Sequence, residues 1–147
     1  MTVSAPVLTE QAIKEFAVAW YKALDRHDPL DTVLPMLHNE GLEMRFPEVT
    51  ARGYDGFTDW YDAVTTRFFD EEHNVRSVEV KSIDGGQADV LVVVNWQCRG
   101  HDGQDARSKW FGFDAYQEWT MVMGPDGPQI LVYGVCRLDA MPGSAEL

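Results

Sequence analysis

Val-Leu-Val-Val-Val-Asn-Trp-Gln-Cys, at residues 90–98, is apolar at nearly every position. Such a run, rich in β-branched residues, is typical of a strand that is covered on both faces in the middle of a sheet. Asp84-Gly85-Gly86 precedes it and is a strong signal for a tight hairpin turn. A valine-rich run, from Val75 to Val80, lies before that turn. We therefore predict that these two runs are neighbouring antiparallel strands.

The β-rich pattern continues toward the end of the chain. A polar segment over residues 100–108 separates the central strand from a long stretch at 109–123, in which we expect a bulge at Gly112. Gly124-Pro125-Asp126-Gly127 then turns the chain into a last strand, residues 130–138. Strands that follow one another with short turns indicate a mostly antiparallel sheet.

The first half of the chain has helical periodicity instead. Apolar residues recur at helical spacing over residues 8–37, with a break at His27-Asp28-Pro29, and again over residues 54–69. Residues 41–47 alternate between apolar and polar side chains and predict a half-buried strand. Helices segregated from strands indicate the α+β class, in which about three N-terminal helices cover one face of a curved sheet and leave a pocket inside a cone.

Composition excludes several classes of function. The chain of 147 residues fits one domain, 1–147, and its hydrophobic content of 45% is enough for a core. A net charge of -12 opposes binding to nucleic acid and to anionic membranes. No signal-peptide pattern or membrane-length apolar run is evident, so we expect a cytoplasmic protein. Cys98 and Cys136 lack the spacing of a zinc site, and we expect neither metal nor cofactor.

These elements, taken together, resemble the nuclear transport factor 2-like superfamily, which includes SnoaL-like polyketide cyclases, ketosteroid isomerases and scytalone dehydratases. The resemblance rests on a first helix that ends in Trp-Tyr-Lys-Ala-Leu-Asp (residues 20–25), on a strand that runs into Phe46-Pro47, on Gly53 before the next helix, and on Gly-Pro-Gln-Ile at 127–130. It implies a cone-shaped, cystatin-like fold, a homodimer, and a pocket for a small apolar or aromatic ligand.

The superfamily's catalytic patterns match this sequence in part. Ketosteroid isomerases stabilise an enolate with a tyrosine on the first helix and an acid on the penultimate strand, near Trp20-Tyr21 and Glu118 here, but Arg45 stands near their proton-moving aspartate. His73 matches the histidine that follows the third helix in scytalone dehydratases. Their second histidine is not matched, and Tyr116 and Glu118 occupy that region. Their Tyr-Asp pair on the first helix is not reproduced either.

These comparisons give a set of candidate catalytic residues. We predict that His73 moves a proton near neutral pH, that Glu118 is its acid or orienting partner, and that Tyr21 donates to a developing oxyanion. The alternation along the strand leaves open whether Glu118 points into the pocket or into solvent. The predicted ligand-binding residues are Trp20, Arg45, Trp60, Trp96 and Tyr116.

Three functions fit this sequence, and whether the protein is an enzyme stays open. The first is a cofactor-independent lyase or isomerase, dehydratase-like or cyclase-like, that acts on a small cyclic or aromatic substrate. The second is a non-catalytic ligand-binding or dimerisation module. The third is the small subunit of a ring-hydroxylating dioxygenase, which would have a large partner chain. The same fold supports all three, so the decision rests on the site.

Overall fold

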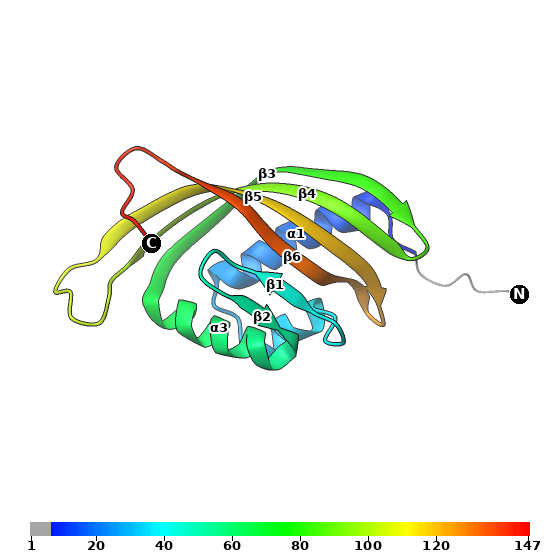
Figure 1. The fold of residues 1–147 in the computed structure, drawn as a ribbon, viewed down its shortest axis with the longest axis horizontal. Helices are drawn as coiled ribbons and strands as arrows, with labels where there is room; N and C mark the ends of the chain where they lie inside the picture. The colour runs from blue at the N-terminus through cyan, green and yellow to red at the C-terminus, as the bar shows by residue number, and fades with distance from the viewer. Residues whose placement is uncertain (1–6) are drawn as a thin grey trace, which may run out of the picture.

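The computed structural model describes residues 7–147, in which helices pack into the concave side of one curved sheet (Figure 1). The N-terminal half contains α1 (Glu10–Asp25), α2 (Leu30–Val33), the 3₁₀-helix η1 (Leu34–Met36), β1 (Glu43–Arg45), β2 (Thr50–Arg52) and α3 (Gly53–Arg67). The long strands follow as β3 (Phe68–Asp84), β4 (Gln87–Gly100), β5 (Lys109–Gly124) and β6 (Gly127–Ala140). Within residues 7–147, no helix is long and apolar enough to cross a membrane.

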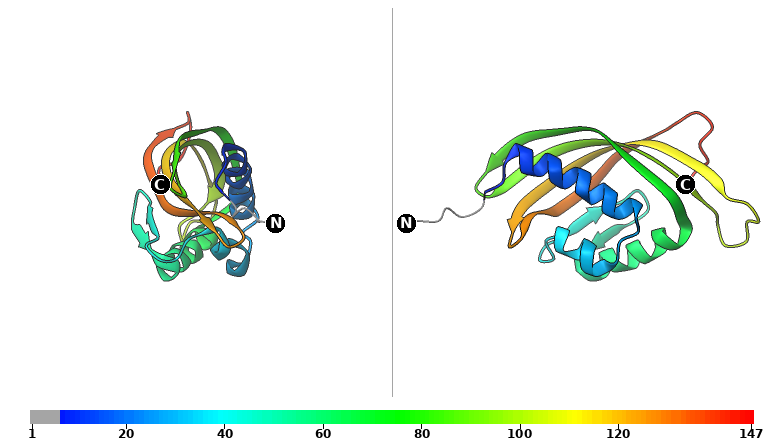
Figure 2. Two further views of the ribbon diagram at one scale, coloured as in Figure 1. Left: turned by 90° about the vertical axis from the view of Figure 1, so that its right-hand side faces the viewer. Right: turned by 180° about the vertical axis from the view of Figure 1, so that it is seen from behind.

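The six strands form one mixed sheet in the order β2-β1-β6-β5-β4-β3. β1 pairs with β6 in parallel, and the other neighbours are antiparallel. Seen end-on, the long strands curl around α1 and α3, so that the helices close the open side of the curve (Figure 2). The predicted α+β fold, a curved and mostly antiparallel sheet covered by N-terminal helices, is confirmed.

Helix α1 supplies the largest side chains of the core. The Thr9 hydroxyl accepts a hydrogen bond from the Ala12 backbone N–H (3.1 Å) and caps the start of the helix. At the other end, the N–H of His27 donates to Leu24 O and that of Asp28 donates to Ala23 O, both at 3.0 Å. This is a Schellman motif, and it requires a left-handed residue, which here is His27 with φ +52°. A histidine in this conformation costs about 1–2 kcal/mol relative to glycine.

Two strands of the structure differ from the sequence prediction. α3 ends at Arg67, so β3 begins five residues before His73. The three-residue strand β2 was not predicted, because it is too short to show a period. Both glycines of the predicted Asp84-Gly85-Gly86 turn have positive φ, as a type I′ turn requires.

The prediction of a bulge at Gly112 is wrong. The register between β4 and β5 is continuous there, with Gln97 opposite Gly112. The register shifts of the sheet lie elsewhere. Three lie along β3, the first of them between Phe69 and Glu72, and two lie between β5 and β6, where the extra residue is on β6. Gly112 is needed for a close approach, since an added Cβ would lie 2.5 Å from the Trp110 ring.

Candidate functional site

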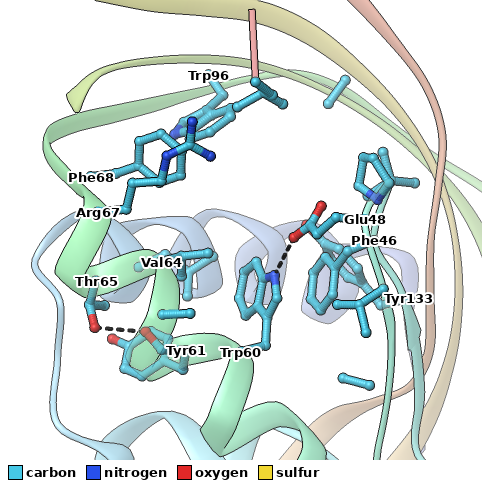
Figure 3. Close-up of a pocket in the computed structure, with 18 of the residues that line it drawn as sticks. Phe46, Glu48, Trp60, Tyr61, Val64, Thr65, Arg67, Phe68, Trp96 and Tyr133 are labelled. Carbon is cyan, nitrogen blue, oxygen red and sulfur yellow. Dashed lines mark hydrogen bonds between the residues drawn. The ribbon is translucent and has the colours of Figure 1, made fainter. Parts of the chain in front are cut away.

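A cavity of about 940 Å³ lies between α3, the β1–β2 hairpin and the concave face of the long strands (Figure 3). Its wall is mostly aromatic and apolar. Trp60 stacks on Phe46, with ring centroids 3.8 Å apart and planes 2° apart, and its indole N–H donates to Glu48 Oε1 at 3.0 Å. A cavity of this size and lining suits a small, flat, largely apolar ligand.

Histidine 73 reaches this cavity and is held by a carboxylate from the end of α1. Asp25 accepts two hydrogen bonds from the same residue, one from the His73 backbone N–H (3.0 Å) and one from its ring Nδ1 (2.5 Å). The ring also stacks between Tyr21, at 4.8 Å, and Trp96, at 6.0 Å. The imidazole is therefore fixed in position and orientation from three sides.

The Asp25 contact also decides which nitrogen of His73 is free. A carboxylate only accepts hydrogen bonds, so Nδ1 carries the hydrogen and Nε2 of the neutral ring keeps its lone pair. Nε2 has no protein hydrogen bond in the described part of the chain, and the His73 side chain, 11% exposed, forms part of the cavity wall. The arrangement presents a base to whatever occupies the cavity.

Across the sheet, Gln117 faces the same cavity and is only 5% exposed. Its Oε1 accepts from the Tyr21 hydroxyl and from the Trp119 indole N–H, both at 2.8 Å. An indole N–H only donates, so the amide atom facing Trp119 must be the oxygen. Gln117 also hydrogen-bonds the Tyr133 hydroxyl, and the second hydrogen of its amide N–H₂ can donate to a ligand in the cavity.

Two tyrosines extend this network. The hydroxyls of Tyr21 and Tyr133 are 3.1 Å apart, and Tyr133 belongs to the cavity wall. Burial raises the pKa of Tyr21 well above its ordinary value, with the neighbouring Tyr133 adding to the effect, and burial also raises the pKa of Tyr133. Both phenols are therefore neutral at physiological pH and act as hydrogen-bond donors.

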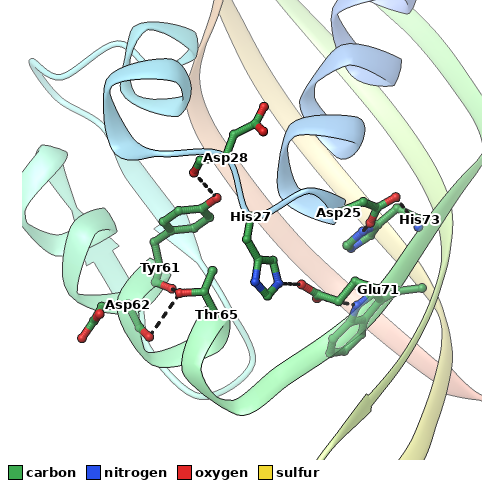
Figure 4. A network of polar contacts seen from close by, with 9 residues as sticks. Asp25, His27, Asp28, Tyr61, Asp62, Thr65, Glu71 and His73 are labelled. Carbon is green, nitrogen blue, oxygen red and sulfur yellow. Dashed lines mark hydrogen bonds and ion pairs between the residues drawn. The ribbon is translucent and has the colours of Figure 1, made fainter.

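A second acid–base contact lies beside the first (Figure 4). Glu71, two residues before His73 on β3, accepts from the Trp96 indole N–H at 3.1 Å through Oε1 and contacts His27 Nε2 through Oε2. Its side chain is 8% exposed and forms part of the cavity wall. Two imidazole–carboxylate pairs thus stand next to each other at one end of the cavity.

The structure brings part of the predicted site together. His73, Trp60 and Trp96 contribute to the cavity wall. Tyr21 lies behind that wall and reaches the cavity through Gln117. Trp20 is 1% exposed and packs against Phe57 and Tyr133, so it belongs to the core rather than to the cavity wall.

Three predicted residues lie on the outside. Glu118 is exposed because its neighbours Gln117 and Trp119 occupy the inward positions of β5. Tyr116 shares that outer face, with the Arg137 guanidinium 4.0 Å above its ring. Arg45 is exposed on β1 and donates to Glu43 at 2.7 Å. None of these three side chains contributes to the cavity.

Four residues of the site were missed by the sequence analysis: Asp25, Gln117, Glu71 and His27. The position of Asp25 could have indicated its role. A carboxylate in the last turn of a helix interacts unfavourably with the helix dipole, which suggests that a specific partner stabilises it. The alternation along β5 could have indicated Gln117, because this polar residue lies on the same face of the strand as the apolar Trp119 and Met121.

Comparison with known proteins identifies the fold. No family model matches this chain, and no curated protein matches it in sequence. A crystal structure from Novosphingobium aromaticivorans, provisionally assigned as an aromatic ring hydroxylase, matches with a TM-score of 0.77 at 16% identity, over 94% of this chain and 96% of that one. A provisionally assigned scytalone dehydratase from the same organism matches with a TM-score of 0.75 at 14% identity, over 93% and 87% of the two chains.

A provisionally assigned dehydratase of the NTF2-like family from Streptomyces avermitilis has a TM-score of 0.72 and 17% identity, over 84% and 92% of the chains. The fold recurs in a hexachlorocyclohexane dehydrochlorinase (TM-score 0.73, 10% identity, 93% and 91% covered). It also recurs in the β subunit of a benzoate dioxygenase from Burkholderia mallei (TM-score 0.69, 17% identity, 92% and 93% covered). The predicted resemblance to the nuclear transport factor 2-like superfamily is therefore confirmed at the level of the fold.

Proposed function

We propose that this protein is a cofactor-independent lyase that eliminates a leaving group from a small cyclic carbonyl compound. The observation that carries the proposal is the His73–Asp25 pair, which leaves Nε2 of a cavity-wall histidine without a protein partner in the described chain, in a mostly apolar cavity that Gln117 also lines. Similarity to proteins named as dehydratases and as a dehydrochlorinase supports this choice of reaction, since both names describe eliminations.

The chemistry assigns one task to each group. His73 Nε2 removes a proton from the carbon next to the carbonyl, and Asp25 stabilises the imidazolium that forms. The negative charge moves onto the carbonyl oxygen, where the Gln117 N–H₂ donates to it. The leaving group then departs from the next carbon and a C=C bond forms. Trp60 and Phe46 hold the ring of the substrate.

Three other functions predict different results. A dioxygenase small subunit would copurify with a large partner chain, as the similarity to the benzoate dioxygenase β subunit suggests. A non-catalytic module would bind a ligand without moving its protons. An isomerase would use the same base but return the proton to the substrate, so its product would keep the mass of the substrate.

Proton abstraction can be tested before the natural substrate is identified. Tetralone has a carbonyl, acidic α-hydrogens and no leaving group, so incubation in D₂O reports base catalysis alone, through α-deuterium incorporation measured by NMR. We expect catalysed exchange with the native protein and a loss of about 10²-fold or more in His73→Gln. His101→Gln, in the exposed loop after β4, is the matched control. Equal exchange by both variants would reject His73 as the base.

A further inference from the structure

We propose that Glu71 and His27 form a second acid–base pair that protonates a leaving hydroxyl group, so that the substrate is a β-hydroxy carbonyl compound and the reaction is a dehydration. This inference rests on the proposed lyase function and specifies its substrate class. A hydroxyl group leaves readily only as water, so it needs an acid, whereas a halide leaves without one. The pair supplies its own proton to the leaving oxygen, separately from the α-proton that His73 holds as an imidazolium.

The environment of Glu71 explains how the pair holds a proton at the cavity. The carboxylate is 8% exposed, and both of its oxygens are engaged, one by the Trp96 indole N–H and the other by His27. A carboxylate oxygen and an imidazole nitrogen can form a hydrogen bond only if a proton lies between them. The contact therefore carries one exchangeable proton next to the ligand.

The backbone is distorted at both members of this pair. Among residues 7–147, the non-glycine residues with positive φ are His27, at +52°, and Asp70, at +51°. His27 is itself one member of the pair, and Asp70 directly precedes the other, within the register shift between Phe69 and Glu72. Bulges of this kind re-aim side chains, and here the bulge lies where Glu71 joins the cavity wall. Strained conformations of this kind cluster at functional sites.

The spacing of Glu71 and His73 fits elimination across one C–C bond. The two residues are two apart on β3 and both belong to the cavity wall, so their Cα atoms are about 6–7 Å apart. One side chain can thus reach a C–H hydrogen while the other reaches the oxygen on the next carbon. His27 also contributes to the wall of a second hollow of about 410 Å³ beside Asp28 and Thr65, through which the pair can regain a proton from solvent.

The dehydration conserves protons and electron pairs. His73 Nε2 takes the α-proton, and the C–H electron pair becomes the enolate and then the new C=C bond. The C–O bond breaks with its electron pair on oxygen, and the proton from the Glu71–His27 contact converts that oxygen to water. His73 then loses its proton to solvent, and the pair gains one through His27. The net reaction is loss of water from the substrate.

Two probes with different leaving groups isolate the acid. A β-hydroxy tetralone and the matching β-chloro tetralone both give the same naphthol, which is followed by absorbance after the uncatalysed rate is subtracted. We expect Glu71→Gln to slow loss of water by about 10²-fold and loss of chloride by less than about threefold. His27→Asn keeps a side chain that tolerates the left-handed conformation, and it should shift the two rates in the same way. Glu72→Gln, exposed and adjacent, is the control.

The outcomes separate this inference from the proposed function. If Glu71→Gln and His27→Asn slow both probes equally, or slow neither, the second acid is wrong, while loss of both reactions in His73→Gln still supports the lyase. If the native protein eliminates neither probe, or if His73→Gln is as fast as the native protein, the lyase itself is rejected. Thermal unfolding of each variant identifies any that fail to fold, and those variants are not used.

Discussion

Replacing Asp25 with asparagine tests the tautomer of His73 with the least change in shape. The carboxylate now accepts from the His73 backbone N–H at 3.0 Å and from Nδ1 at 2.5 Å. An asparagine can satisfy the backbone N–H with its oxygen, but its N–H₂ group then faces Nδ1. Because that group only donates, Nδ1 must accept, and the ring hydrogen moves to Nε2. The base then has no lone pair directed at the substrate.

The expected loss of proton abstraction is large. An equivalent change of tautomer in a catalytic triad lowers the rate by about 10⁴-fold, and we expect a loss of roughly 10³–10⁴-fold for Asp25→Asn. The free energy of unfolding should change much less than the rate of proton abstraction. Loss of a hydrogen bond to a charged group costs about 1.5–3 kcal/mol, and removal of a negative charge from the end of α1 returns about 0.3–1 kcal/mol. The net loss is about 1–2 kcal/mol.

Two measurements test whether Asp25 sets the tautomer of His73. Deuterium exchange into tetralone reports the base, and urea unfolding reports the free energy of unfolding. Asp31→Asn, which removes the same charge from an exposed position on α2, should leave the exchange rate unchanged. If Asp25→Asn exchanges within threefold of the native rate while remaining folded, Asp25 does not set the tautomer, and the argument for His73 Nε2 as the base fails.

Three further predictions follow from other contacts. Gln117→Leu should slow elimination from the tetralone probes by about 10²-fold because the oxyanion loses its donor, and steady-state kinetics on a variant confirmed as folded would show it. The free energy of unfolding should fall as pH rises above about 10, because burial raises the pKa of Tyr21 and of Tyr133 while the unfolded phenols ionise near their ordinary value. Urea unfolding at increasing pH measures this fall, which should be shallower in Tyr21→Phe. The predicted homodimer should have twice the monomer mass by light scattering. We expect the outer face of β4 to be its interface, so Val93→Asp, a change on that half-buried face, should convert the dimer to a monomer.

Most of the fold follows from local patterns in the sequence. The nearly continuous apolar run over residues 90–98 indicates a strand in the middle of a sheet whatever its neighbours are. The two glycines after Asp84 allow a tight turn through their own conformational freedom. Helix α1 likewise follows from its apolar stripe and its Thr9 cap. These signals lie within a few residues of the elements that they specify, so they can be read without knowledge of the tertiary structure.

The site could not be predicted in the same way, because its contacts depend on phase and on distant partners. Asp25 and His73 are 48 positions apart, and their pairing depends on where β3 crosses the end of α1. On β5 a shift of one residue exchanges Gln117 for Glu118 at the cavity wall, and composition alone does not show which of them faces inward. The sequence analysis expected the carboxylate partner of His73 at Glu118 on β5, whereas the structure pairs His73 with Asp25 at the end of α1.

The end of α1 and the start of β3 act as one unit in this site. Asp25 and His27 are two apart on one segment, and they pair with His73 and Glu71, which are two apart on the other, in antiparallel order. One pair places a carboxylate behind an imidazole, and the other places an imidazole behind a carboxylate, so the two groups that reach the cavity differ in kind. A base and an acid thus arise from the same two residue types by exchanging their order. The Schellman end of α1 and the bulge of β3 together set this alignment, and a change in either should alter both pairs at once.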